Sequence, residues 1–193
     1  MNEVAVVEAD VRIREAAAQA CSEHDEATYL MTHRTEISAI HEYNRTSLHS
    51  TIFQIFRENH GSDLVTELQQ SYQCVATVTH KSPLFLLEGG TIESEANETL
   101  IIIPLGYIST YPSTPKPATG CIVADRDGYY EPVILALSTL SSKWSILKWE
   151  TGTFIRVPPG SQLKVESGIV FFLLLSINLQ PFHPGELPLT APQ

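Results

Sequence analysis

The feature that most constrains the fold is the uneven distribution of proline along the 193 residues. All 12 prolines lie at or beyond Pro83. Because proline interrupts helices and inner strands, the second part of the chain must be built from short elements. From Tyr72 onward, short runs rich in β-branched and aromatic residues alternate with proline and glycine, which is typical of strands joined by turns. This pattern favours an antiparallel barrel or sandwich over a parallel sheet with crossover helices.

Short strands are expected throughout the region between residues 74 and 177. They cover residues 74–79, 84–87, 99–103, 120–124, 129–137, 143–149, 153–157, 163–166 and 169–177. The last strand contains the longest apolar run, which is far too short for a membrane-spanning helix and predicts a strand buried on both faces. Residues 110–119 contain three prolines and predict a loop, a candidate lid. Residues 181–193 predict an extended, proline-rich tail.

Residues 1–72 contain neither proline nor lysine, and they predict an acidic helical segment. Apolar residues at helical spacing indicate one helix from Val11 and a second that begins after Asp25 and runs through Leu48. A third helical stretch is expected to end at Gly61, where a left-handed glycine would stop it. A short helix then begins at Ser62.

Composition and charge restrict the function classes. A hydrophobic content of 43% in a chain of this length supports a sizeable core without disulfide or metal. Three scattered cysteines do not make a disulfide framework, and the first residues lack the basic and apolar regions of a signal peptide. The net charge of −10 disfavours nucleic acids and anionic membranes as partners. We therefore expect a cytoplasmic protein.

One segment is more specific than the rest of the sequence. It reads Gly152-Thr153-Phe154-Ile155-Arg156-Val157-Pro158-Pro159-Gly160-Ser161-Gln162-Leu163. Pro159 sets the φ angle of a turn, and Gly160 accepts the positive φ that a type II turn requires. The segment resembles the second conserved motif of the cupins, in which a glycine opens a strand that runs into a Pro-x-Gly turn. The resemblance implies a mainly β fold, a jelly-roll antiparallel β-barrel over residues 73–180 with a cavity at one end, and barrels that pair as a homodimer.

The cupin metal ligands are missing from this chain. In the resemblance, the second motif's histidine falls at Gln162 or Leu163, and nothing in residues 73–150 supplies the first motif's His-x-His. We therefore expect a barrel without metal or cofactor. If Leu163 and Val165 point inward, the cavity wall is apolar there and suits an organic ligand more than a hydrated ion.

Four polar residues are the candidate catalytic groups. Asp127-Gly128 predicts a hairpin turn, after which Tyr129 and Glu131 share one face of a strand. A tyrosine beside a carboxylate can act as a general acid–base pair. His80 and Arg156 are polar residues in otherwise apolar strands, and they are expected to face the same cavity. The structural alternative is plain turn chemistry with two packed tyrosines.

Other polar residues have simpler explanations. The histidines of the front segment are expected on helix surfaces or at helix caps; they are His24, His33, His41, His49 and His60. The acidic run between residues 93 and 98 predicts a hairpin tip that keeps a sheet edge soluble. Its alternate carboxylates also suit a hard cation.

These observations predict a metal-independent isomerase or cyclase that acts on a hydrophobic small molecule, in a biosynthetic pathway. The alternative is a non-catalytic barrel that binds a small molecule or scaffolds a partner through its acidic helices. A further alternative is a metal-dependent dioxygenase whose ligands escape recognition, such as His80 with Glu88 or Glu95.

Overall fold

The computed structural model describes residues 3–8, 10–22, 40–86, 88–108, 132–141 and 143–182. Several predictions lie outside these residues: the helix after Asp25 up to residue 39, the strand at 120–124, the loop at 110–119 and the tail beyond residue 182. No helix in the described part of the chain is long and apolar enough to cross a membrane.

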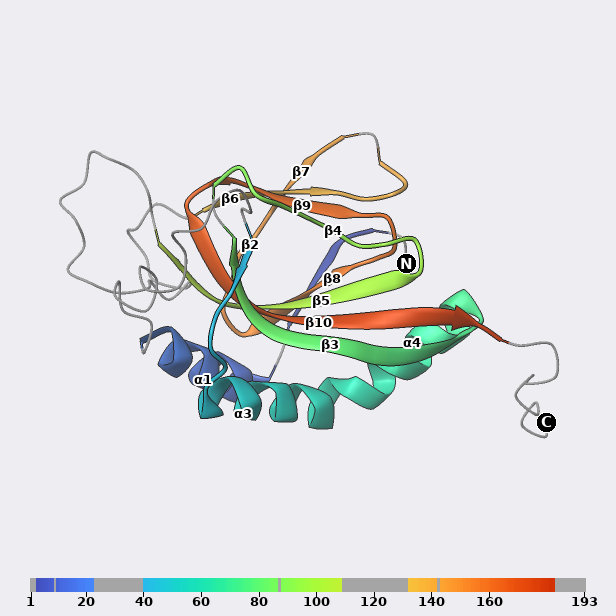
Figure 1. Ribbon diagram of the computed structural model, residues 1–193, viewed down its shortest axis with the longest axis horizontal. Helices are drawn as coiled ribbons and strands as arrows, with labels where there is room; N and C mark the ends of the chain where they lie inside the picture. The colour runs from blue at the N-terminus through green and yellow to red at the C-terminus, as the bar shows by residue number, and fades with distance from the viewer. Residues whose placement is uncertain are drawn as a thin grey trace.

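The described strands form two antiparallel sheets that face each other (Figure 1). The larger sheet has the order β1 (Ala5–Glu8), β8 (Thr153–Val157), β5 (Glu98–Ile108), β10 (Ile169–Pro181), β3 (Cys74–Leu86) and β2 (Ile40–Glu42). The smaller sheet has the order β4 (Thr91–Glu93), β9 (Gln162–Ser167), β6 (Val133–Leu137) and β7 (Ser145–Leu147).

The strand order is that of a jelly roll. From β3 to β10 the chain passes back and forth between the sheets, so that β3, β5, β8 and β10 share one sheet and β4, β6, β7 and β9 share the other. The described strands form two separate sheets and no closed barrel. Strands β1 and β2, from the front segment, pair with the edges of the larger sheet.

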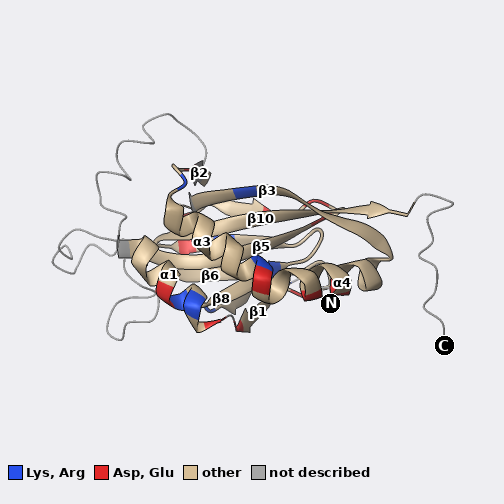
Figure 2. Cartoon of the chain, turned by 90° about the horizontal axis from the view of Figure 1, so that it is seen from below, with Lys and Arg blue, Asp and Glu red and all other residues tan. Residues whose placement is uncertain are grey.

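The front segment was predicted to be helical, but it also contributes the strands β1 and β2. Its helices are α1 (Val11–Ser22), α3 (Ser47–Phe56) and α4 (Ser62–Tyr72), with a π-helical turn, η1 (Arg57–Gly61), between the last two. Seen from the helix side, α1, α3 and α4 lie across the outer face of the larger sheet (Figure 2). The prediction of a left-handed stop at Gly61 is wrong: its φ is −62°, and the helix continues to Tyr72, where the left-handed residue Gln73, with a φ of +49°, caps it.

Two hydrophobic cores lie on the two faces of the larger sheet. The helix-side core includes Phe171 and Leu173 of β10 together with the apolar faces of α1, α3 and α4. The inter-sheet core includes Val170 and Phe172 of the same strand. The prediction that the apolar run is a strand buried on both faces is thus confirmed, since neighbouring residues enter different cores.

Other strand predictions have mixed outcomes. The strand at residues 153–157 is confirmed as β8, whereas residues 74–79 and 84–86 belong to one long strand, β3. Residues 143–149 contain only the short β7. In the described part of residues 129–137, the strand begins at Val133. The strand β4, which precedes the acidic turn, was not expected.

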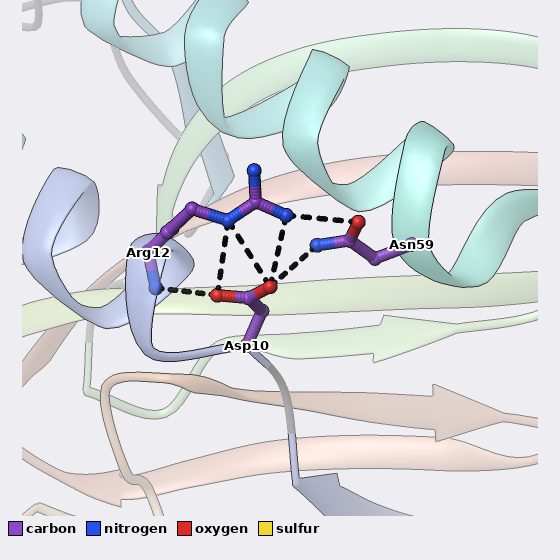
Figure 3. A network of polar contacts seen from close by, with 3 residues as sticks. All are labelled: Asp10, Arg12 and Asn59. Atoms are coloured by element: carbon purple, nitrogen blue, oxygen red, sulfur yellow. Dashed lines mark hydrogen bonds and ion pairs between the residues drawn. The ribbon is translucent and has the colours of Figure 1, made fainter.

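A polar network connects the start of α1 to η1 (Figure 3). The Asp10 carboxylate accepts hydrogen bonds from the Arg12 backbone N–H at 2.7 Å, from Arg12 Nη2 at 3.0 Å and from Asn59 Nδ2 at 2.7 Å. Arg12 Nη2 also donates to Asn59 Oδ1 at 3.0 Å. These hydrogen bonds with Arg12 lower the pKa of Asp10. The network therefore orients the first turn of α1 against the π-helical turn.

His49 has a capping role, as expected, but lies inside the protein. Its Nδ1 accepts the Thr46 backbone N–H at 3.0 Å, which satisfies an exposed amide before α3. The side chain is fully buried and contacts the edge of the Tyr43 ring. Its position among apolar side chains shows that this histidine belongs to the packing of the helix layer.

Candidate functional site

The cupin-like motif folds as expected. Gly160 has a φ angle of +69°, which confirms the predicted turn, and Gly168 has a φ angle of +85°. In β9, Leu163 and Val165 are buried in the inter-sheet core, whereas the alternate residues Gln162, Lys164 and Glu166 are exposed or half-buried. The predicted inward and outward alternation of this strand is therefore confirmed.

The structure describes two of the four predicted catalytic residues, His80 and Arg156. Tyr129 and Glu131 lie outside the described residues. The strand that follows them, β6, begins at Val133 opposite Ser167, just before β10 begins. His80 pairs with Ser176, which lies seven residues after Ile169, the first residue of β10. That separation is roughly 23 Å at the rise of a strand. The strand after Glu131 thus starts at the end of the sandwich away from His80.

Arg156 faces the helices and not the space between the sheets. Its neighbours in β8, Ile155 and Val157, occupy the inter-sheet core, so alternation directs Arg156 to the other face. There Nη1 forms an ion pair with Glu67 of α4 at 2.6 Å. Strands β5 and β10 separate β8 from β3, so Arg156 and His80 do not share a cavity. The prediction that they do is wrong.

His80 lies beside an irregularity in the pairing of β3 with β10. The register shifts between Ser176 and Ile177, which leaves Thr79 as an extra residue in β3. His80 pairs directly with Ser176, and such partners have side chains on one face about 5 Å apart. Ser176 also pairs with Leu100 of the inter-sheet core. His80 is therefore an exposed residue on the inner face of the larger sheet.

Polar side chains from three neighbouring strands meet at this irregularity. We call Thr79, His80, Glu98 and Ser176 the bulge cluster. The Ser176 hydroxyl donates to Glu98 Oε1, and its oxygen lies 3.1 Å from Thr79 Oγ1. Ser176 is buried, Glu98 is half-buried and His80 is exposed. The cluster thus presents a hydrogen-bonded carboxylate and an imidazole, two groups that can exchange protons with a ligand.

The sequence identified only part of the bulge cluster. His80 was a candidate, whereas Glu98 was assigned to a solubilising hairpin tip and Ser176 to an apolar strand. Glu98 and Ser176 are 78 residues apart in the chain. Their proximity depends on the pairing of β5 with β10, and no local pattern reports that pairing. A serine inside an apolar run was the one available signal.

The turns at the same end of the sandwich are held by buried hydroxyl groups. Ser94 Oγ donates to the Pro158 carbonyl at 2.5 Å and accepts the Ser161 N–H at 3.1 Å. Thr139 Oγ1 donates to the Pro159 carbonyl at 2.8 Å. Ser94 and Ser161 are fully buried. These bonds fix the turn that precedes β9, where the cupins carry their second-motif histidine.

The described residues do not suit the metal of a cupin enzyme. No group of three His, Cys, Asp or Glu side chains among them could hold a metal ion. The inner face of β9 presents Leu163 and Val165, which have no donor atoms. No step of the chemistry below is therefore routed through a metal.

The inter-sheet core is apolar and densely occupied. Trp149 donates its indole N–H to the Gly106 carbonyl at 3.2 Å, and its ring meets the Phe172 ring edge to face at 5.9 Å. Its other members come from both sheets. The inner surface next to the bulge cluster is thus hydrophobic, as predicted for this fold.

Comparisons with known proteins support the fold assignment. No family model and no curated protein matches the chain. The solved structure of the non-heme alpha ketoglutarate dependent epimerase SnoN from nogalamycin biosynthesis is similar, with a TM-score of 0.51 and 8% identity over 100% of this chain and 87% of that chain. This likeness shows the fold alone.

Two further structures score lower. SnoN in complex with Fe3+, alpha ketoglutarate and nogalamycin RO has a TM-score of 0.47 at 9% identity, covering 100% of this chain and 90% of that one. A Pseudomonas putida prolyl-4-hydroxylase has a TM-score of 0.45 at 6% identity, covering 94% of each chain.

Proposed function

We propose that this chain is a cupin-fold enzyme that isomerises or cyclises a hydrophobic small molecule by proton transfer at the bulge cluster. The observation that carries the proposal is the position of Glu98 and His80 on the inner face of the larger sheet, on either side of Ser176. The neighbouring inner surface is apolar, which favours a hydrophobic substrate. The likeness to an epimerase of a biosynthetic pathway supports the choice of reaction only through the fold.

The proposed reaction removes one proton from the substrate and returns one, so the product has the same atomic composition as the substrate. The Glu98 carboxylate accepts a proton from a carbon next to a carbonyl group, and the His80 imidazolium returns a proton to another carbon or to the opposite face. The Ser176 hydroxyl holds the Glu98 carboxylate in place. Exchange with water then restores both groups. A positioned acid and base contribute about 10²- to 10⁴-fold each to such a step.

The first measurement is native mass spectrometry with elemental analysis on the full chain, purified without chelator. An organic molecule retained at one per chain would supply the substrate or an analogue of it. Stoichiometric iron, manganese or zinc would contradict the metal-independent proposal and favour the dioxygenase alternative. In that case the ligands would have to include residues outside the described part of the chain.

The second measurement tests the bulge cluster directly. The recovered molecule is incubated with the protein in D2O, and the uptake of deuterium at carbon is followed by NMR. We expect Glu98→Gln and His80→Gln to slow the exchange at least about 100-fold. Glu93→Gln is the matched control, because Glu93 is an exposed carboxylate of β4. Unchanged exchange in both cluster variants would overturn the site assignment.

A non-catalytic binding protein is the second candidate. Its scaffolding form is favoured by the occupied inter-sheet core, whose members are each less than 8% exposed. It is also favoured by the hydrogen bonds within the bulge cluster, which hold β3, β5 and β10 together. A tightly bound molecule that is recovered unchanged, without deuterium uptake at any carbon, would support this alternative. Tyr129 and Glu131 stay predictions as a further acid–base pair.

A further inference from the structure

A pocket of about 200 Å³ lies between α3 and the edge of the larger sheet. It is lined by Arg45, Ser50, Phe53, Gln54, Arg57 and Lys81. Three of these six residues carry a positive charge, and none carries a negative one. The whole sequence has only 12 lysines and arginines against 22 acids. A quarter of its basic residues thus meet in one small pocket.

The fold explains why these residues converge. Ser50, Gln54 and Arg57 follow the 3–4 spacing that places residues on one face of a helix. Lys81 pairs with Leu175, which belongs to the helix-side core, so Lys81 is on the face of β3 that meets α3. Its neighbour His80 is on the opposite face. The pocket is therefore separate from the bulge cluster, and the larger sheet lies between them.

Arg45 is held in a fixed orientation within the pocket. Its Nε donates to Ser50 Oγ at 3.1 Å, and its guanidinium carbon lies 5.0 Å from the centroid of the Phe53 ring. Phe53 is buried and forms the apolar floor. The two Nη groups have no partner among the described residues, so their planar edge can donate two parallel hydrogen bonds.

The charges of the pocket are not neutralised by neighbouring acids. In the described part of the chain, no carboxylate forms an ion pair with Arg45, Arg57 or Lys81. Glu58 contacts one lining residue: its Oε1 accepts a hydrogen bond from the Gln54 side-chain amide at 2.9 Å. Three cations that converge without a counter-charge raise each other's energy, and an anion would relieve that repulsion.

We infer that this pocket binds the phosphate group of a small phosphate monoester. The dianion matches three converging cations better than a carboxylate does, and its oxygens match the fork of Arg45. A volume of about 200 Å³ holds the phosphate with a few further atoms. The acidic protein as a whole repels anions, so affinity depends on this local convergence and falls as salt screens it.

Isothermal titration calorimetry of the full chain with phenyl phosphate and with inorganic phosphate tests the inference. We expect saturable binding at one site, tighter at pH 7.5 than at pH 5, because the second ionisation of a phosphate ester lies near pH 6. Tighter binding of phenyl phosphate identifies a monoester site, and equal binding identifies a site for free phosphate. Acetate, a monoanion, is expected to bind at least about tenfold more weakly, since it offers one charge fewer.

Arg57→Gln and Lys81→Gln are each expected to weaken phosphate binding about tenfold, because each removes a charge-assisted hydrogen bond. Lys143→Gln is the matched control, since it removes one exposed charge next to the smaller sheet. Circular dichroism checks that all three variants fold. Absent binding, or equal affinity in all three variants, would overturn the inference. Deuterium exchange at the bulge cluster is measured separately, so either proposal can fail alone.

Discussion

At the scale of single residues, the glycine that opens the cupin-like motif has a packing role. Gly152 has a φ of +86°, which is unfavourable for other residues. A Cβ atom built at this position would lie 2.6 Å from Cβ of Arg14 in α1. Gly152 therefore allows α1 to approach the start of β8. The sequence identified the glycine through the motif, whereas the contact with the helix emerged only from the structure.

A matched pair of substitutions separates the cost of the left-handed backbone from the cost of the contact with Arg14. Gly89 has a similar φ of +80°, but nothing lies within 4 Å of a Cβ added there. We expect Gly89→Ala to lower the free energy of unfolding by about 1 kcal/mol through the backbone alone. Gly152→Ala should lower it by about 3 kcal/mol, because Arg14 must also move. Urea denaturation measures both values, and equal losses would contradict the packing role.

At the scale of elements, α3, η1 and α4 form one continuous helical stretch. The sequence predicted a break at Gly61, but the apolar face continues from Phe56 to Leu64 and Leu68, all of them buried. Burial of that face outweighs the helix-breaking tendency of glycine, which is only about 1 kcal/mol. The extra residue of the π-helical turn keeps the two apolar faces on the same side.

Replacing Gly61 with alanine distinguishes a helix interior from a left-handed helix end, because the two predict opposite changes in the free energy of unfolding. At a φ of −62°, alanine is compatible with the backbone, and its Cβ would contact Arg57 Cγ at 3.4 Å. We expect Gly61→Ala to raise the free energy of unfolding by about 0.5–1 kcal/mol, because alanine favours a helix interior. If Gly61 were left-handed, the same substitution would instead lower the free energy of unfolding. Thermal unfolding followed by circular dichroism gives the sign.

At the scale of the whole molecule, β10 joins the front segment to the sandwich. Neighbouring residues of this strand enter different cores, Leu173 on the helix side and Phe172 between the sheets. Strands β1 and β2 of the front segment extend both edges of the same sheet. Residues 1–72 were predicted as a helical segment and residues 73–180 as a barrel, and their described parts share one sheet. We therefore expect them to unfold together.

Substitutions in the two cores test this cooperativity. Phe172→Ala and Leu173→Ala should each lower the free energy of unfolding by about 3–4 kcal/mol, since each opens a cavity in a filled core. Both variants should keep a single transition when tryptophan fluorescence and far-UV circular dichroism are compared. Trp149, beside Phe172, reports the inter-sheet core. If the helices of Leu173→Ala melt before the tryptophan fluorescence changes, the front segment and the sandwich unfold as independent units.

Local patterns in the sequence were sufficient for much of the fold. Glycine and proline positions predicted the turn at Gly160, and alternation predicted the inward face of β9. The motif predicted a jelly roll. Strands β1, β2 and β4 were missed because three or four residues are too few to display a period. Their existence depends on partner strands far along the chain.

The sequence by itself determined the fold class, the β8–β9 motif and the absence of the cupin histidines from it, because each depends on neighbouring residues. Only the tertiary structure decided which polar groups meet. It placed Arg156 against Glu67, joined Glu98 to Ser176, and gathered three cations at one pocket. The physical reason is that the alternation of side chains along a strand decides which face each one occupies. Which other side chains it contacts there depends on the order and register of strands that are distant in the sequence.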